Sequence, residues 1–162
     1  MLFPIFLPAT WRELGAGLFG RIGEQLEYRA YLVTGFNAAG FSSSGIRDGR
    51  QSGNRSIAED FALVGRLDWT PREGLLLGGS AYLGNSGQDQ SSSASGLERD
   101  LPDARLAIAE LHGQWRRGRL QTRGVLSYTH LSDAEDLNVA LGTSRTSPIA
   151  REMLGGYAEL GY

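Results

Sequence analysis

Charged side chains alternate with apolar ones in several segments of this sequence, and these charges could steer ions or take part in chemistry. In an extended strand successive side chains point to opposite faces, so charges at every second position share one face. If that face lines a water-filled passage, its charges set the field that passing ions meet. A simpler interpretation is that they are solvated wall residues that pair with one another. The candidates are Arg29, Arg66, Asp68, Glu110, His112 and Arg123.

Motifs for catalysis, cofactors or metals are weak. Residues 15–20 match the letters G-x-G-x-x-G, but the next segment reads as a strand. No carboxylate lies around Gly35, about 20 positions on, where a dinucleotide-binding fold needs one. His112 and His130 have no partner at ligand spacing. We therefore predict no enzyme activity, no catalytic residue, no cofactor and no metal site.

Composition narrows the class further. A length of 162 residues fits one domain, and the absence of cysteine excludes a disulfide scaffold and thiolate metal sites. A net charge of −2 argues against a nucleic-acid binder, which usually carries a basic stripe. No apolar run approaches the ~20 residues of a membrane helix. The apolar opening, residues 1–8, lacks basic residues and is cut by two prolines, so it does not read as a signal peptide.

The clearest element is a β-hairpin over residues 61–83. Period-2 alternation flanks residues 71–74, where proline fixes φ at the entry of a tight turn and glycine allows a positive φ at its exit. Arg66 and Asp68 lie on one face of this hairpin, and the other face is wholly uncharged. The uncharged face carries Phe61, Leu63, Gly65, Leu67 and Trp69 in the first arm and Leu75, Leu77, Gly79, Ala81 and Leu83 in the second.

The rest of the chain repeats this unit. Short turns alternate with long polar loops, which is typical of a meander with one turn-bearing rim and one loop-bearing rim. The third loop should contain a short helix, because Ser132 and Glu135 fit a capping box and Gly142 fits a C-terminal glycine. The predicted strands are residues 11–19, 25–37, 104–115, 120–131 and 152–162, the further turns 20–23 and 116–119, and the loops 38–60, 85–103 and 132–150.

Alternation alone does not show which face is buried, because a soluble sandwich or barrel turns its uncharged face inward. Three features favour an apolar face that meets a membrane. The strands have about 9–13 residues, the length that a tilted strand needs to cross a bilayer. Trp69 and Trp115 both precede a short turn on the uncharged face, as in an aromatic belt at a membrane interface. The face is also rich in Ala, Gly and Thr, which fill a close-packed core poorly.

Five stretches carry this strand-and-turn pattern: TWRELGAGLFG (10–20), EYRAYLVTGFNAAGF (27–41), EDFALVGRLDWTPREGLLLGGSAYLGNSGQ (59–88), PDARLAIAELHGQW (102–115) and LGGYAELGY (154–162). Together they resemble the outer-membrane porins of Gram-negative bacteria, most of all the phosphate-selective-porin-like group. The resemblance implies an antiparallel up-and-down transmembrane β-barrel of roughly sixteen strands around a water-filled lumen. It also implies contact with outer-membrane lipid and lipopolysaccharide, small hydrophilic solutes as cargo, and a homotrimer as an available assembly.

The sequence departs from that family in its charges. Phosphate selectivity in the family would need a ladder of lumenal Arg and Lys. Here the basic candidates are offset by acidic residues on the same face, which argues against an anion preference. The offsetting residues are Glu27, Asp68, Glu110 and Glu159.

We therefore expect residues 1–162 to form one partial barrel domain, a curved open sheet of about seven strands that lacks the export signal, early strands and closing strand of such a porin. The expected function is passive diffusion of small hydrophilic solutes or ions through the outer membrane, with no role for nucleic acid. Two alternatives stay open: a soluble ligand-binding β-barrel or β-sandwich, and a non-conducting structural outer-membrane barrel. Residues 46–55 could fold inward as a constriction or form a plain exposed loop.

Overall fold

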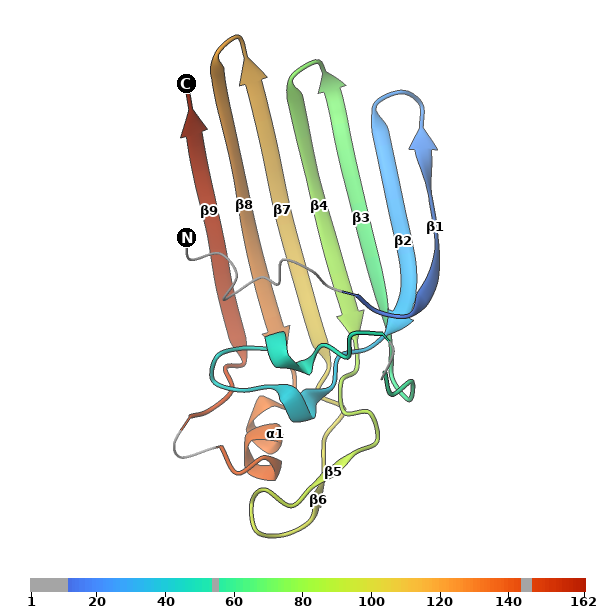
Figure 1. Cartoon of the computed structure of the whole chain (residues 1–162), viewed down its shortest axis with the longest axis vertical. Coiled ribbons are helices and arrows are strands. Elements are labelled where there is room, and N and C mark those ends of the chain that lie inside the picture. Colours follow the sequence, from blue (N-terminus) through green and yellow to red (C-terminus); the bar gives the residue numbers. More distant parts are fainter. Residues whose placement is uncertain (1–11, 54–55, 144–146) are drawn as a thin grey trace.

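The computed structural model describes residues 12–53, 56–143 and 147–162, and one antiparallel sheet of seven strands dominates it (Figure 1). The sheet order is β1-β2-β3-β4-β7-β8-β9, so each strand pairs with its neighbours along the chain. The predicted all-β antiparallel meander is confirmed. Its strands are β1 (Gly15–Ile22), β2 (Leu26–Thr34), β3 (Phe61–Arg72), β4 (Leu75–Gly84), β7 (Leu106–Arg117), β8 (Leu120–Leu131) and β9 (Glu152–Gly161).

The smaller elements all lie in the long loops. The first loop contains the 3₁₀ helices η2 (Ala38–Gly40) and η3 (Arg47–Gly49). The second contains a two-stranded ribbon, and the third contains α1 (Ala134–Ala140). The ribbon strands are β5 (Ser91–Ser92) and β6 (Arg99–Asp100). In the described part of the chain, no helix has the length and apolar character needed to cross a membrane.

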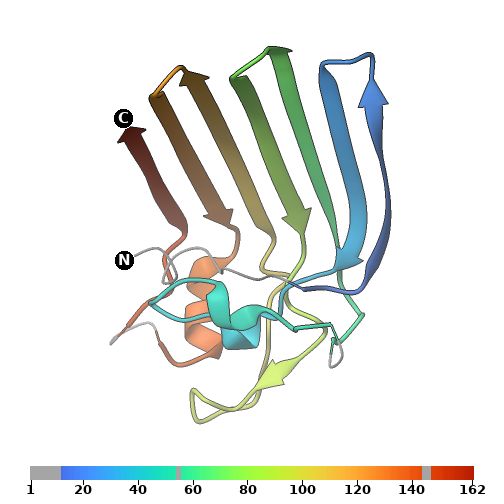
Figure 2. The ribbon, with the colours of Figure 1, turned by 45° about the horizontal axis from the view of Figure 1, so that its top comes forward.

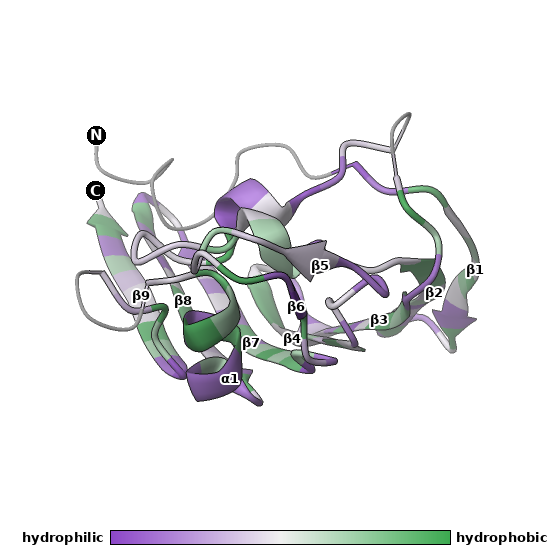
Figure 3. Cartoon of the chain, turned by 90° about the horizontal axis from the view of Figure 1, so that it is seen from below, coloured by the Kyte–Doolittle hydropathy of each residue, from purple (hydrophilic) through white to green (hydrophobic). Residues whose placement is uncertain are grey.

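Short turns and long loops lie at opposite ends of the sheet. Figures 1 and 2 show the β1–β2, β3–β4 and β7–β8 turns at one end and the loops with α1 at the other. Figure 3 shows the sheet as an arc, with loop segments on its concave side. Strands β1 and β9 each pair on one side only, so the sheet is open, as predicted, and the described residues form no closed barrel.

Several strand ends differ from the prediction. β1 runs to Ile22 instead of stopping at residue 19, and the turn follows at residues 23–25, where Gly23 has a φ of 63°. Residue 11, where this strand was predicted to begin, lies outside the described residues. β2 stops at Thr34 and not at residue 37, because Asn37 leaves the sheet to cap η2 by accepting a hydrogen bond from Ala39 N.

A bulge between Trp69 and Arg72 makes the β3–β4 turn tighter than predicted. Arg72 is still in the strand and pairs with Leu75, so the turn is two residues long, not four. Without the bulge, Trp69 would pair with the next residue along β4. The uncharged residues of the two strands would then lie on opposite faces of the sheet. With it, Trp69 pairs with Leu77 on the same face. Pro71 lies within the bulge, where a residue without an N–H is tolerated.

The convex face of the sheet is the apolar one, and its charged strand residues, such as Arg117 and Glu152, lie at strand ends. Most of its leucines are solvent-exposed in this chain, including Leu67 at 47%, Leu111 at 66% and Leu126 at 52%. These three belong to one row of paired residues that crosses β3, β4, β7 and β8. An exposed apolar surface this extended is unusual for a soluble protein and typically marks a membrane or protein contact.

The hydrophobic core lies on the concave face, at the loop end of the sheet. Phe36 packs edge-on against Phe41 and Tyr82, with ring centroids 6.0 and 5.3 Å apart. Leu137 of α1 and Leu131 at the end of β8 are completely buried in the same cluster. The loops are therefore packed onto the sheet rather than extending freely from it.

The first long loop crosses the concave side from β2 toward the far edge of the sheet (Figure 1). At its tip, a Cβ added to Gly45 would lie 3.7 Å from the sulfur of Met153 in β9. Gln51 holds the return segment, because its amide donates to Gly35 O and Ile57 O and accepts from Ile57 N. This loop thus spans several strands.

The helix in the third loop exists but begins differently from the prediction. Asp133 is the N-cap residue, has a left-handed φ of 56°, and makes no side-chain capping hydrogen bond. The capping box of Ser132 and Glu135 is therefore wrong. The predicted C-terminal glycine is confirmed, because Gly142 follows the helix with a φ of 68°.

Candidate functional site: a charged network on the concave face

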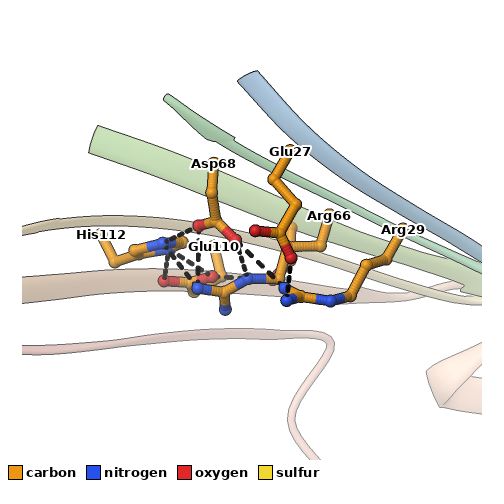
Figure 4. A network of polar contacts seen from close by, with 7 residues as sticks. Glu27, Arg29, Arg66, Asp68, Glu110 and His112 are labelled. Atoms are coloured by element: carbon orange, nitrogen blue, oxygen red, sulfur yellow. Dashed lines mark hydrogen bonds and ion pairs between the residues drawn. The ribbon is translucent and has the colours of Figure 1, made fainter. Parts of the chain in front are cut away.

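Six charged or ionisable side chains from three strands meet on the concave face (Figure 4). The sheet register explains why: two adjacent rows of paired residues cross β2, β3, β4 and β7, and charges occupy most positions. We call these six residues the charged network. They are Glu27, Arg29, Arg66, Asp68, Glu110 and His112.

Asp68 is the centre of the charged network. Arg66 donates to both of its oxygens, from Nε to Oδ2 at 2.7 Å and from Nη2 to Oδ1 at 2.9 Å. Arg29 Nη1 donates to Oδ2 at 3.2 Å, and His112 Nε2 lies 2.7 Å from Oδ1. One carboxylate therefore holds side chains from three strands, and Arg29 is also paired with Glu27.

His112 lies between two carboxylates. Its Nδ1 is 2.9 Å from Glu110 Oε1, while its Nε2 faces Asp68. Glu110 also accepts from the Ser80 hydroxyl at 2.7 Å, so its position is fixed from β4 as well.

Exposure divides the charged network into two layers. The side chains of Asp68, His112 and Glu110 are 10%, 12% and 17% exposed, whereas those of Arg29 and Arg66 are 38% and 39% exposed. A solute on the concave side would therefore meet the two guanidinium groups and Glu27, whose side chain is 41% exposed, with the carboxylates of Asp68 and Glu110 beneath them. Compact pairing of this kind holds charged groups in place.

The structure brings together five of the six residues that the sequence proposed as pore-lining candidates. Arg123 is the exception: it lies on β8 and pairs with Glu159 of β9, with Nε 2.5 Å from Oε2. Both partners are about half exposed. Whether any of these residues lines a pore stays a prediction, but their mutual pairing agrees with the simpler interpretation of paired wall residues.

Two further positions, not among the candidates proposed from the sequence, support the charged network. Ser80 lies between Arg66 and Glu110 in one row, and Gly78 lies between Asp68 and His112 in the other. Both sit on the same face as the charges, so alternation along β4 was the signal that could have found them.

The described residues do not suggest a metal centre. Within residues 12–53, 56–143 and 147–162, no group of three or more His, Asp or Glu side chains is placed to hold a metal ion. The second histidine, His130, contacts only a single carboxylate, Glu152, at 3.7 Å.

Comparisons with known proteins leave the family open. No protein-family model and no solved structure matches the chain. A protein of Aquifex aeolicus (strain VF5), described as uncharacterized, is 26% identical over 164 aligned residues, which cover 96% of this chain. The chain spans 35% of the length of that relative.

Proposed function

We propose that this chain is part of the wall of an outer-membrane β-barrel of the porin type, a passive channel for small hydrophilic solutes or ions. The observation that carries the proposal is the exposure of the apolar convex face, with charges and loops gathered on the concave face. In water this arrangement is unfavourable. Burial of each such apolar side chain would stabilise the fold by roughly 1.5–3 kcal/mol, and exposure loses that stabilisation. In a bilayer the same face lies against lipid tails, and the charged network faces a wet interior.

The soluble alternative requires a different arrangement. A β-sandwich would place a second apolar layer against the leucines of the convex face. The loops pack on the opposite, concave face instead, where they form the core around Leu131 and Leu137. In water, the convex leucines of the described residues would then need a further apolar surface to cover them.

A non-conducting barrel is the second candidate, and one observation favours it. The first long loop crosses the concave side as far as Met153 and is anchored there by Phe41 and Gln51. In a closed barrel, a loop in this position would narrow the lumen or plug it.

Planar-bilayer conductance of the full-length protein separates the two membrane candidates. A porin gives stepwise, ohmic current increments, whereas a plugged barrel inserts without them. Insertion is scored independently by heat-modifiable gel mobility in vesicles. A protein that stays monodisperse without detergent and never inserts would contradict both membrane candidates and favour the soluble fold.

Cysteine labelling tests the face assignment directly, because the chain has no cysteine of its own. Leu111 and Gln114 lie on opposite faces of β7, and both are exposed in this chain. In vesicles, Gln114→Cys should react with a water-soluble maleimide, while Leu111→Cys should be protected by lipid. Equal labelling of both positions would show that the convex face does not contact the bilayer.

A further inference from the structure

The rim formed by the short turns carries an excess of positive charge. We define the short-turn rim as residues 21–25, 71–75 and 116–119. It contains five arginines and two glutamates, and all five arginines are exposed. The loop segments 35–60, 85–105 and 132–151 carry ten acidic residues and seven arginines. The two ends of the sheet therefore differ in the sign of their charge.

Backbone contacts hold the three turns of this rim together. Thr70 N donates to Gln25 O at 2.7 Å, which joins the first turn to the second. Arg116 N donates to Gly74 O at 2.7 Å, which joins the second turn to the third. The arginines are thus concentrated along one edge of the molecule, which Figure 1 shows as the end opposite α1.

The rim arginines have donors available for a ligand. Within the described residues, Arg72, Arg116 and Arg117 form no ion pair with a carboxylate. Arg21 donates to a backbone carbonyl, that of Glu24, and the Arg119 guanidinium stacks 5.1 Å from the centroid of the Tyr162 ring. Planar guanidinium groups bind phosphate oxygens strongly, often through two parallel hydrogen bonds.

Aromatic residues mark where this charged rim meets the apolar convex face. Trp69 is 46% exposed and precedes the second turn, and Trp115 precedes the third. Tyr162, 89% exposed, lies beside Arg119. Indole and phenol rings favour the boundary between acyl chains and headgroups, and long arginine side chains extend from there toward the polar layer.

We infer that the short-turn rim binds the phosphate groups of anionic phospholipids at one surface of the membrane. The inference rests on the proposed function, because it requires the convex face to lie in a bilayer. The complementarity is electrostatic. An arginine next to the membrane is attracted to an anionic lipid surface, whereas the acidic loop end of the sheet is not. The rim would therefore set which lipids surround this part of the wall.

Fluorescence quenching by brominated lipids tests the inference in the full-length protein. The protein is folded into phosphatidylcholine vesicles that contain either brominated phosphatidylcholine or brominated phosphatidylglycerol. The fluorescence of Trp69 is obtained as the difference between the unsubstituted protein and its Trp69→Phe variant. We expect phosphatidylglycerol to be favoured near Trp69 by roughly two- to five-fold, and less so at high salt.

The decisive variant is Arg116→Gln with Arg117→Gln, which should abolish most of this preference. Arg99→Gln with Arg105→Gln removes the same charge from the loop end and should leave the preference unchanged. If the protein inserts and conducts but shows no headgroup preference, or if both double variants lower it equally, the inference is overturned and the proposed function stands. Failure to insert into either kind of vesicle would overturn both.

Discussion

The carboxylate of Asp68 and the imidazole of His112 are 2.7 Å apart although their strands, β3 and β7, are not neighbours in the sheet. Strand β4 runs between them, and the residue at the intervening position is Gly78. A Cβ at Gly78 would lie 2.5 Å from His112 Nε2 and 2.6 Å from Asp68 Oδ1. The two side chains therefore meet across a strand only because that strand has no side chain there.

Gly78→Ala should disrupt this contact. The added methyl group must displace either the imidazole or the carboxylate, and overpacking of this kind typically costs about 1–3 kcal/mol. The free energy of unfolding of the full-length protein in vesicles, measured with urea, checks this. Gly65→Ala is the matched control, because nothing lies within 4 Å of its added Cβ. The control should be neutral or stabilising by up to about 1 kcal/mol. Equal losses in both variants would contradict the geometric explanation.

Asp68→Asn should both destabilise the protein and change its ion selectivity. The substitution leaves Arg66 and His112 without their shared carboxylate, at a cost of about 1–3 kcal/mol. It also adds one positive charge to the concave face, so the reversal potential under a salt gradient should move toward anions. Glu159→Gln makes the same charge change in the exposed pair with Arg123, and we expect it to leave the unfolding free energy unchanged. Asp68→Asn without any loss of stability would show that the charged network does not brace the sheet.

Leu111→Arg and Leu67→Arg should each destabilise the membrane-folded protein by about 2–4 kcal/mol, because they place a charge near the middle of the lipid-facing surface. Leu75→Arg, beside the short turn, should cost less because its side chain can reach the headgroups. Urea unfolding in vesicles measures all three. A neutral Leu111→Arg would mean that the convex face is not the lipid-facing one.

Gly49→Ala should loosen the first long loop. A Cβ at this position would lie 2.6 Å from Asn37 O and against the Phe41 ring, so η3 would have to move. We expect faster proteolysis between residues 35 and 60 and, if the loop narrows a lumen, larger single-channel conductance. Ser43→Ala, at an exposed position of the same loop, should change neither. Faster proteolysis with unchanged conductance would show that the loop does not constrict the channel.

Alternation of side chains predicted the sheet well because one face of each strand is apolar and carries charge only near the strand ends, as at Arg117 and Glu152. The predicted strand 120–131 matches β8 to the residue, and its pairing with β7 needs no bulge, since Trp115 and Thr122 already share a face. The charged network was predictable as a set of residues on one face for the same reason.

The partners within the charged network were not predictable from alternation. Alternation places Gly78 and not Gly79 on the charged face of β4, but it does not give the register, and the bulge before the β3–β4 turn decides which of them lies beside Asp68. Without that bulge, Gly79 would take the place of Gly78. A single extra residue in β3 thus determines whether Asp68 can reach His112.

The structure of the loops was also not predictable from sequence patterns. Its anchors join residues far apart in the chain, such as Phe36 N donating to the Tyr82 hydroxyl at 3.1 Å. The hydrophobic residues of these loops recur with no period, so neither the crossing of the concave side nor the left-handed start of α1 at Asp133 had a readable signal.

The direction of the two edge strands restricts how this sheet can become a ring. Seven strands of alternating direction leave β1 and β9 pointing the same way, so joining them directly would create one parallel seam. Two copies related by a two-fold axis could pair β9 with β9 in antiparallel fashion, but that symmetry would send their loops to opposite rims. A ring that is antiparallel throughout and keeps every long loop on one rim therefore needs an odd number of additional strands between β9 and β1, which gives an even total.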